Sequence, residues 1–520
     1  MYRRTLLTAT AAALARPAVA QPAAVLRMVP QTNLGSIDPI WTTANITRNH
    51  AFMVYDTLYG LDAQLTPRPQ MAAGETVDDD GQRVTITLRD GLLFHDGAPV
   101  LARDAAASIK RWMVRNPFGQ KLATVTETVS ALDDKRLVLR LTKPFPLLTT
   151  ALASIGSCCF VMPERVAATD PFKQITDATG SGPFQFLPDE LNSGSLVAYA
   201  RNRAYRPRDE PVSFTAGGKQ AFFDRVEWRI IPDAATAAAA LQNREIDWFE
   251  QPPPELQELL ARDRAIAIER IDPRPNPAML RLNHLHPPFD TKAARQALLP
   301  AILQADFMNA IVGSDPENWS NIGAFTPGTP MANDAGMAVL TGPRSLDRAR
   351  ALLREAGALT PLTRLIGPTD LLAPAAMTQV CAALFRDLGL NLDVALSDWG
   401  TVIQRRASRE PVAKGGWSAL LTTFSSFDWL DPAGDAVIRA NGTDAWFGWP
   451  TIPRLEQLRD TWFVAPNLAA QKAICTEMQR VAFDEIPFIP VGAYYSPTAL
   501  RRELKGRVGG FAIFYNLKRG

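Results

Sequence analysis

The fold class is decided by residues 80–111, which read DGQRVTITLRDGLLFHDGAPVLARDAAASIKR. Val84, Ile86 and Leu88 alternate with polar residues in this stretch, which predicts a strand with one buried face. Residues 102–114 carry apolar side chains at helical spacing, which predicts a helix that follows the strand. A strand covered by a neighbouring helix is typical of a mixed α/β fold.

A second alternating segment, RLVLRLT, lies at residues 136–142 and places Leu137, Leu139 and Leu141 on one face. This pattern predicts another half-buried strand. Tight turns are predicted at three Asp-Gly pairs, because glycine adopts a positive φ at no steric cost. These pairs are Asp80-Gly81, Asp90-Gly91 and Asp96-Gly97.

The second half of the chain alternates predicted helices with predicted strands. Ser345 is placed to cap a helix that ends at Gly357, and a further helix ends at Gly389. The strand-like NLDVAL follows at residues 391–396, and Asn467 is placed to cap a third helix. Such alternation builds open α/β sheets.

The composition is that of a globular protein, with 520 residues, 47% hydrophobic and 21% charged. It excludes a disordered chain and a collagen or coiled-coil rod, and the length predicts about three domains or lobes. The formal charge is +2, and removal of Arg3, Arg4 and Arg16 would leave one more acidic than basic side chain. Such a balance does not attract nucleic acid or an anionic membrane, so neither is expected as a partner.

The first twenty residues have the pattern of an export signal. Arg3-Arg4 precede an apolar run of small residues, and Ala18-Val19-Ala20 fits a cleavage site. We expect cleavage after Ala20 and a mature chain that begins at Gln21. The general and the twin-arginine export routes both fit. No later stretch holds eighteen uncharged apolar residues, so an exported, soluble protein is predicted.

Four cysteines do not make a disulfide framework. Cys158 and Cys159 are adjacent and would form only a strained bridge, whereas Cys381 and Cys475 each lie in a helical pattern. The latter two would pair if their helices touch. An exported chain permits that bond, and both the paired and the free state remain open.

Catalytic signatures are absent from the sequence: it contains no G-x-S-x-G, no phosphate-binding G-x-x-x-x-G-K-[ST] and no H-E-x-x-H. We therefore expect neither an enzyme nor a cofactor. His284 and His286 would share a face of an extended segment and could chelate a metal. Because no carboxylate or cysteine accompanies them at ligand spacing, a loop that enters Pro287-Pro288 is favoured and no metal is expected.

Aromatic residues and carboxylates gather between residues 417 and 449, where four of the eleven tryptophans fall. Large apolar walls with a few polar groups are what a small-molecule site requires. Asp428 stands between Phe427 and Trp429, and a buried carboxylate needs a cationic partner, for which an ammonium group on a ligand is suited. A hinge core with a capping aspartate fits the same composition, and both alternatives remain open.

Several segments together match one protein family in order and spacing. They are SIDPI at 36–40, VYDTLYGLD at 54–62, the stretch at 80–111, TGSGPFQF at 179–186, RNRAY at 201–205, IIPDAATAAAALQNREID at 230–247, LRLNHLHPPFDTKAARQALLPAI at 280–302, LDRARALLREAG at 346–357 and DWLDP at 428–432. On these segments the chain resembles the extracellular solute-binding proteins of ABC importers, in the class that includes dipeptide, oligopeptide, glutathione and nickel receptors.

The resemblance implies an α/β clamshell of two lobes, with an extra α/β subdomain in the first lobe. It implies a periplasmic monomer that closes on a peptide or other small solute and docks on an inner-membrane permease. A secreted hydrolase and a chaperone or signalling receptor on the same scaffold are the alternatives. The implied division is a signal peptide (1–20), first-lobe core (21–58, 181–270 and 485–520), extra subdomain (59–180) and second lobe (271–484).

The resemblance also implies a ligand site around Asp428. In peptide-binding relatives, an aspartate four residues before the proline of this motif receives the α-ammonium group of the ligand, and Asp428 precedes Pro432 by four residues. Asn33 would approach from the other lobe, and Trp399 is a candidate for which a core role fits equally well. The remaining expected lining residues are Phe424, Ser425, Phe427 and Trp429.

Two departures from the family pattern bear on the ligand and on the fold. No basic residue occurs between Arg364 and Arg386, where dipeptide receptors hold the ligand carboxylate. A dipeptide is therefore disfavoured, and a longer peptide, another amine and an opine-like ligand remain open. Arg244 replaces a glycine of the family, and a left-handed arginine would cost about 1–2 kcal/mol, so the turn is expected to shift.

Overall fold

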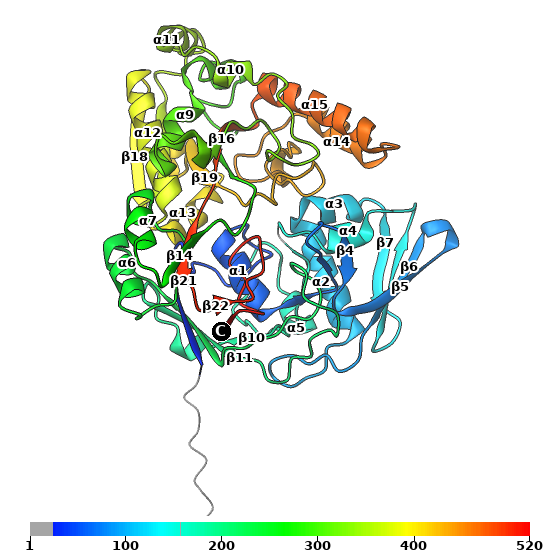
Figure 1. Cartoon of the computed structure of the whole chain (residues 1–520). Coiled ribbons are helices and arrows are strands. Elements are labelled where there is room, and N and C mark those ends of the chain that lie inside the picture. The colour runs from blue at the N-terminus through cyan, green and yellow to red at the C-terminus, as the bar shows by residue number, and fades with distance from the viewer. Residues whose placement is uncertain (1–23, 157) are drawn as a thin grey trace, which may run out of the picture.

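The computed structural model describes residues 24–156 and 158–520, so the expected signal at 1–20 with cleavage after Ala20 lies outside the described residues. In this part, the chain forms two lobes that lie one above the other in Figure 1. Each lobe is built on one large sheet with helices packed against it. None of the helices in the described ranges is both long and apolar enough for a membrane crossing.

The first lobe is built on a sheet with the strand order β10-β11-β12-β1-β13-β21-β14, here called the first-lobe sheet. Its parallel centre pairs β1 with β12 and β13, so strands far apart in the sequence lie side by side. The strands are β1 (Val25–Val29), β10 (Phe184–Phe186), β11 (Leu196–Arg201), β12 (Arg225–Arg229), β13 (Trp248–Phe249), β14 (Ile266–Glu269) and β21 (Thr498–Arg501). The helices of this lobe are α1 (Asn45–Val54), α6 (Ala234–Gln242) and α7 (Pro254–Ala261).

An extra subdomain projects from the first lobe on the right of Figure 1. Its sheet has the order β5-β6-β8-β7, with β5 (Ala72–Asp78), β6 (Arg83–Leu88), β7 (Thr126–Ala131) and β8 (Arg136–Leu141). The helices α2 (Ala102–Arg115), α3 (Pro117–Ala123), α4 (Leu148–Leu152) and α5 (Glu164–Ala167) accompany it, and two short ladders join β2 (Asp56–Thr57) to β9 (Phe160–Val161) and β3 (Tyr59–Leu61) to β4 (Pro67–Pro69). Both predicted strands and the predicted helix are confirmed. Gly81, Gly91 and Gly97 have positive φ, as the Asp-Gly turns require.

The second lobe is built on a sheet with the order β16-β20-β15-β19-β17-β18, here called the second-lobe sheet. Its strands are β15 (Asn276–Leu282), β16 (Trp319–Ser320), β17 (Leu362–Pro368), β18 (Asn391–Ser397), β19 (Ala419–Thr423) and β20 (Ile489–Tyr494). Its helices are α8 (Lys292–Gln296), α9 (Gln304–Val312), α10 (Ala338–Thr341), α11 (Leu346–Glu355), α12 (Leu372–Asp387), α13 (Trp399–Arg406), α14 (Pro453–Phe463) and α15 (Leu468–Glu485). The predicted caps are confirmed: the side chain of Ser345 accepts a hydrogen bond from the Arg348 amide, and that of Asn467 from the Ala470 amide.

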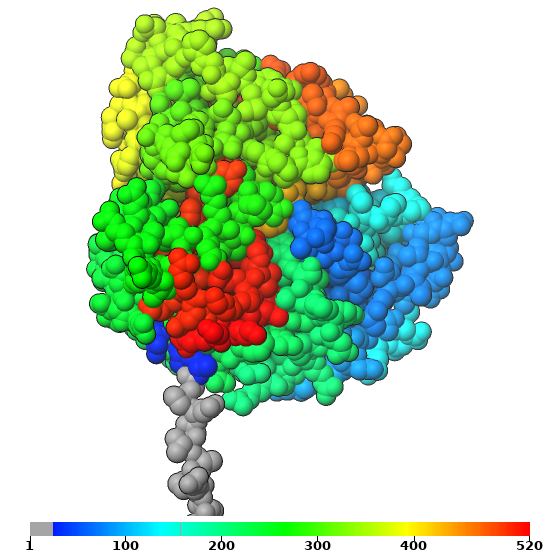
Figure 2. All heavy atoms as spheres, in the orientation of Figure 1, coloured from blue at the N-terminus to red at the C-terminus, as the bar shows by residue number. Residues whose placement is uncertain are grey.

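The C-terminal segment returns to the first lobe later than expected. β20 pairs with β15 and β16 in the second-lobe sheet, so residues 489–494 still belong to the second lobe. Only β21, which starts at Thr498, joins the first-lobe sheet. The return to the first lobe was expected at residue 485. Judged by the sheet to which each strand belongs, the chain returns after Tyr494, since β20 pairs within the second-lobe sheet and all its residues are buried. Figure 2 shows the red C-terminal segment on the surface of the lower lobe.

Two other expectations are settled by the structure. Arg244 has a φ of 64°, so the arginine itself adopts the left-handed conformation and the expected shift of the turn is wrong. Cys381 and Cys475 belong to different hydrophobic clusters, and they are free thiols, as are Cys158 and Cys159. The disulfide that remained open is therefore not formed.

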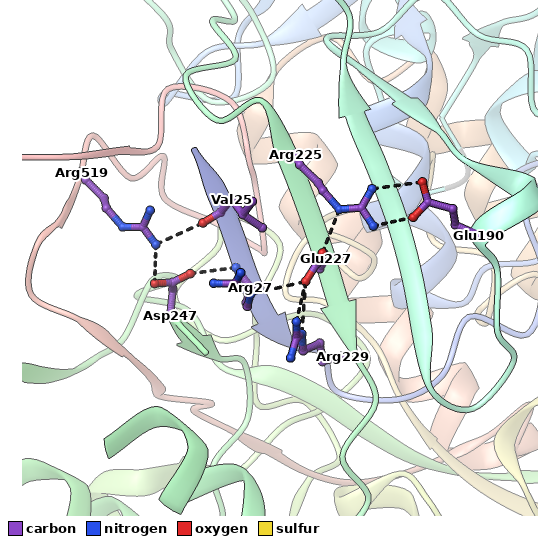
Figure 3. Close-up of polar contacts among 8 residues, drawn as sticks. All are labelled: Val25, Arg27, Glu190, Arg225, Glu227, Arg229, Asp247 and Arg519. Carbon is purple, nitrogen blue, oxygen red and sulfur yellow. Dashed lines mark hydrogen bonds and ion pairs between the residues drawn. The ribbon is translucent and has the colours of Figure 1, made fainter. Parts of the chain in front are cut away.

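Charged side chains on the first-lobe sheet hold both ends of the described chain together (Figure 3). Arg519 is the second residue of β23 (Lys518–Arg519), which pairs with β22 (Leu504–Lys505). It donates to the Asp247 carboxylate at 2.7 Å and to the Val25 carbonyl at 3.1 Å. On the neighbouring strand, Glu227 is surrounded by three arginines. These are Arg27, Arg225 and Arg229. An ion pair joins β1 to β12, and the hydrogen bond from Arg519 to the Val25 carbonyl joins the C-terminal segment to β1.

Candidate ligand-binding site

Two adjoining cavities lie between the lobes at the loop that follows β19. The larger has a volume of about 260 Å³, and Asp428 of the second lobe and Gly156 of the first lobe line both. Arg48, on α1 of the first lobe, lines the smaller one. A concave site between two lobes, with a few polar groups, is where a receptor that closes on its ligand would bind it.

Asp428 uses only one of its carboxylate oxygens for a hydrogen bond within the described residues. The Ser425 amide donates to Oδ2 at 2.8 Å. The other oxygen, Oδ1, faces Gly156 so closely that a Cβ atom there would lie 2.8 Å away. Burial raises the pKa of Asp428, and the positive charge of Arg48 opposes this effect. Oδ1 is therefore an acceptor at the cavity that a cationic group would stabilise.

Arg48 is a buried cation with unused donors. Its exposed fraction is 9%, and its guanidinium lies 4.3 Å from the centre of the Phe511 ring. Nε and Nη1 are buried and have no hydrogen-bond partner within the described part of the chain. Burial lowers the pKa of Arg48, and the charges of Asp428 and Glu250 counteract this. The arginine thus compensates the Asp428 charge at a distance, since the two side chains form no ion pair in the described residues.

Further charged groups surround a third cavity of about 70 Å³, which Arg48 also lines. Arg274 forms an ion pair with Asp272 at 3.0 Å, and its guanidinium lies 4.1 Å from the centre of the Phe427 ring. Asp272 accepts a hydrogen bond from the Ser426 hydroxyl. These contacts join residues 270–275, which connect β14 of the first-lobe sheet to β15 of the second-lobe sheet, to the loop that carries Asp428.

Glu250, at the same cavity, is a carboxyl group held in a low-dielectric position. It accepts hydrogen bonds from the Gln31 amide at 2.7 Å and from the Asn49 side chain at 3.2 Å. Burial raises the pKa of Glu250 from 4.5 to about 7, despite these bonds and the charge of Arg48. Glu250 therefore exchanges a proton near neutral pH.

The structure brings three of the predicted site residues together. Phe427 lines the cavity of about 260 Å³ with Asp428, and Ser425 lines the cavity of about 70 Å³. Phe424 and Trp429 pack behind them, with ring centres 6.0 Å apart, and Trp429 is fully buried. These two side chains support the loop rather than line the cavities.

The other two predicted residues lie elsewhere. Asn33 donates to the Ser193 hydroxyl at 3.4 Å and does not line the cavities that contain Asp428. Trp399 begins α13, where its amide donates to Asp370 at 2.7 Å and its ring is buried. Trp399 also does not line those cavities, so its position is that of a core residue.

The lobes touch along several hydrogen bonds beside the cavities. Arg439 of the second lobe donates to the Gln120 side chain of α3 at 2.9 Å, and Arg459 donates to the Pro117 carbonyl at 2.9 Å. Phe214 and Phe427 stack across the boundary, with ring centres 4.8 Å apart. The described conformation is therefore one in which the lobes are in contact.

A separate cavity of about 510 Å³ opens between the subdomain and the second lobe. Trp446 and Trp449, from the predicted aromatic stretch, line it opposite Trp41 and Arg115. Thr43 lines both this cavity and the small one with Arg48, so the two spaces adjoin. The interlobe space can thus hold a solute with more bulk than the surroundings of Asp428 alone allow.

The candidate metal ligands His284 and His286 face different segments. His286 contacts the Arg409 carbonyl at 2.8 Å, whereas His284 packs against the carbonyls of Ile486 and Pro487. In residues 24–156 and 158–520, no group of three or more histidine, cysteine or acidic side chains is arranged to hold a metal ion.

The sequence analysis missed Arg48, Gly156, Glu250 and Arg274. Arg48 carried only a weak local signal, since the first half of α1, NITRNH, is mostly polar although the structure buries nearly all of it. The other three have no local signal, because they reach the site from segments that only the tertiary structure brings together.

Comparison with known proteins identifies the family. The model of the bacterial extracellular solute-binding proteins, family 5 (middle region), matches residues 66–437. The chain is 36% identical over 479 residues to the probable peptide ABC transporter periplasmic-binding protein y4tO of Sinorhizobium fredii, covering 92% of this chain and 90% of that protein.

Solved structures share the fold. The periplasmic binding protein DppA of Helicobacter pylori, in complex with the peptide STSA, aligns with a TM-score of 0.78 and 19% identity over 95% of this chain and 98% of that one. AgaA of A. tumefaciens R10, in complex with agropinic acid, aligns with a TM-score of 0.76 and 19% identity over 95% of this chain and 99% of that one. This chain therefore belongs to the family 5 extracellular solute-binding proteins, the periplasmic substrate receptors of ABC importers.

Proposed function

We propose that this receptor captures a peptide or other solute with a free ammonium group, which binds the Asp428 carboxylate between the lobes. The observation that carries the proposal is the geometry of Asp428: Oδ2 is held by the Ser425 amide at 2.8 Å, while Oδ1 faces a cavity next to Gly156. An ammonium group can donate to Oδ1 in a charge-assisted hydrogen bond. Asp428, Phe427 and Ser425 are the residues that we assign to the ligand.

The relatives support this class of ligand without naming the compound. The Sinorhizobium fredii relative is named as a probable peptide ABC transporter binding protein, and the DppA structure holds a peptide. The missing basic residue between Arg364 and Arg386 disfavours an ordinary dipeptide. We therefore propose a longer peptide or another amine.

The proposal includes a transport cycle. The loaded protein docks as a monomer on an inner-membrane ABC permease, after export and cleavage behind Ala20. The first-lobe core, the subdomain at 59–180 and the second lobe act as the three bodies of this cycle. Amino-terminal sequencing of the periplasmic protein is expected to start at Gln21, and light scattering is expected to give the mass of one chain.

The experiment that tests the proposal has two steps. Protein purified from the periplasm is analysed by native mass spectrometry and then denatured. We expect denaturation to release an amine-bearing solute. The mass of this solute should stay the same when it is incubated with the protein, because a receptor does not convert its ligand. Replacement of Asp428 by Asn should then weaken that solute by about 1.5–3 kcal/mol in calorimetry, the range for a hydrogen bond to a charged group.

A matched control is Asp347→Asn, because Asp347 is exposed on α11 and lines none of the interlobe cavities. Its affinity is expected to stay within about 0.5 kcal/mol of wild type. Equal affinities of wild type and Asp428→Asn would refute the assignment of Asp428. Conversion of the solute to products would instead favour a hydrolase.

A further inference from the structure

The unused donors of Arg48 indicate that a part of the ligand is an acceptor. Nε and Nη1 are buried without a hydrogen-bond partner in the described residues, although the side chain is only 9% exposed. A buried donor without a partner is costly, and a cation more so. The Phe511 ring lies 4.3 Å from the guanidinium and covers one of its faces. It does not accept the hydrogen bonds that the N–H groups of Arg48 offer in the plane of the guanidinium. An acceptor from outside the chain would satisfy these groups.

The position of Arg48 places this acceptor next to the proposed ammonium site. Arg48 and Asp428 come from opposite lobes and line the same small cavity. In the described structure they do not approach within ion-pair distance of each other, and Asp428 Oδ1 and the Arg48 donors are both unengaged. A ligand group with a cationic and an anionic end can therefore bridge them and hold the lobes together.

The charges around the cavity favour a group with no net charge. The negative charges of Asp428, Glu250 and Asp272 lie close enough to Arg48 to oppose the effect of its burial. Arg274 neutralises Asp272 in an ion pair at 3.0 Å. The charges that remain are the positive charge of Arg48 and the negative charges of Asp428 and of a partly protonated Glu250. Their sum is not positive. A simple anion would be repelled, whereas a zwitterion meets one charge of each sign.

We propose that the ligand ends in a free α-amino-acid group, whose ammonium binds Asp428 and whose carboxylate binds Arg48. Both charged groups of such an end are attached to one carbon atom, which suits two partners of opposite charge on one cavity. The space that Arg48 and Asp428 share is about 10 Å³ with the lobes in contact, so it must widen to admit the end group. The amino terminus of an ordinary peptide offers a neutral carbonyl group at this place. The inference rests on the proposed function and narrows it to solutes such as side-chain-linked peptides, which keep a free α-carboxylate beside the amine.

The test compares two pairs of compounds. The two glutamyl-alanine dipeptides are isomers with the same mass and charge, whereas L-alaninamide replaces the carboxylate of L-alanine by a neutral amide. Calorimetry with γ-L-glutamyl-L-alanine and α-L-glutamyl-L-alanine, and with L-alanine and L-alaninamide, separates the α-carboxylate from the amine. We expect the γ-linked isomer and the free amino acid to bind about 10- to 100-fold more tightly than their counterparts, the range for one hydrogen bond between charged groups.

Two variants at Arg48 assign this preference to its side chain. Arg48→Gln is expected to abolish the preference, and Arg48→Lys to retain part of it because the charge remains. Arg136→Gln is the matched control, since Arg136 is exposed on β8, lines none of the interlobe cavities and should leave the preference unchanged. Thermal melting without ligand shows whether each variant is folded.

The remaining outcomes separate the two proposals. In one outcome, L-alaninamide and the α-linked isomer bind as well as L-alanine and the γ-linked isomer, in wild type and Arg48→Gln alike, and Asp428→Asn abolishes binding. The zwitterion inference is then wrong and the proposed amine receptor stands. If no compound of the four binds to folded wild-type protein at millimolar concentration, the zwitterion inference is overturned. If binding is equal in wild type and Asp428→Asn, the proposed function itself fails.

Discussion

Gly156 and Asp428 face each other across the boundary of the lobes, so closely that a Cβ atom at position 156 would lie 2.8 Å from Asp428 Oδ1. This distance is shorter than a carbon–oxygen contact allows, so a methyl group would displace the carboxylate or occupy the space for a ligand. The glycine thus keeps open the side of Asp428 that the Ser425 amide does not use.

Gly156→Ala is therefore expected to weaken an amine ligand by about 10-fold or more while the protein stays folded, because only the end of a flexible side chain must move. Calorimetry with the solute released from the native protein measures the affinity. Gly74→Ala is the control, since a Cβ at Gly74, on β5, meets nothing within 4 Å. Unchanged affinity in Gly156→Ala would show that the ligand does not use Oδ1.

Ligand affinity is expected to fall at acid pH because Asp428 must be ionised to hold an ammonium group. Burial raises the pKa of Asp428 above its ordinary value of 3.8, so protonation competes with the ligand at a higher pH than it would at an exposed aspartate. Calorimetric affinities between pH 4 and pH 8 should decline toward the acid end. In Asp428→Asn the affinity should be weak and should lose this part of the pH dependence; an equal slope in both proteins would contradict the assignment.

Local patterns explain which parts of the fold could be predicted. The alternation of Val84, Ile86 and Leu88 and the cap at Ser345 depend on near neighbours, and the structure confirms both. The membership of β20 in the second-lobe sheet depends on pairing with β15, some two hundred residues earlier, and the sequence carries no signal for it.

The same distinction applies to the site. Asp428 was predicted because its aromatic neighbours and its motif lie beside it in the sequence. Arg48 and Gly156 meet it only when the lobes come together, and their residue types have no meaning for a ligand until that contact is seen. Trp399 and Asn33 show the converse, since both are residue types suited to a ligand site but neither lines the cavities around Asp428. Trp399 is buried in the core, and Asn33 donates to the Ser193 hydroxyl.

Arg244 provides a test of conformational strain. Its φ of 64° is left-handed, which costs an L-residue about 1–2 kcal/mol relative to glycine. Arg244→Gly removes this cost but increases the freedom of the unfolded chain, so a net gain of about 0.5–1 kcal/mol in unfolding free energy is expected. Urea denaturation measures it. Asn243→Gly, next to it and at negative φ, should destabilise instead; a loss of stability in Arg244→Gly would show that the arginine side chain stabilises the turn.

The contacts between the lobes set how easily the receptor opens. The Gln120 side chain accepts a hydrogen bond from Arg439 at 2.9 Å across the boundary, and Gln120→Ala removes it. The loss of about 0.5–1.5 kcal/mol should shift the unliganded protein toward the open form and reduce ligand affinity about 2- to 10-fold. Small-angle scattering is expected to give a larger radius of gyration than for wild type. Gln64→Ala, at an exposed position of the first lobe, is the control and should change neither quantity.

Glu250 should make the stability of the unliganded protein depend on pH near neutrality. Burial raises the pKa of Glu250 from 4.5 to about 7, so between these values the native state binds more protons than the unfolded state does. The free energy of unfolding therefore falls as pH rises through this interval, and the loss is complete above pH 7. Glu250→Gln keeps an acceptor for the Gln31 amide but has no charge to bury. Relative to wild type it should gain about 1–3 kcal/mol between pH 4 and pH 8 in urea denaturation. Glu255→Gln, exposed on α7, should show no such gain; a flat difference for Glu250→Gln as well would mean that Arg48 already compensates the charge of Glu250.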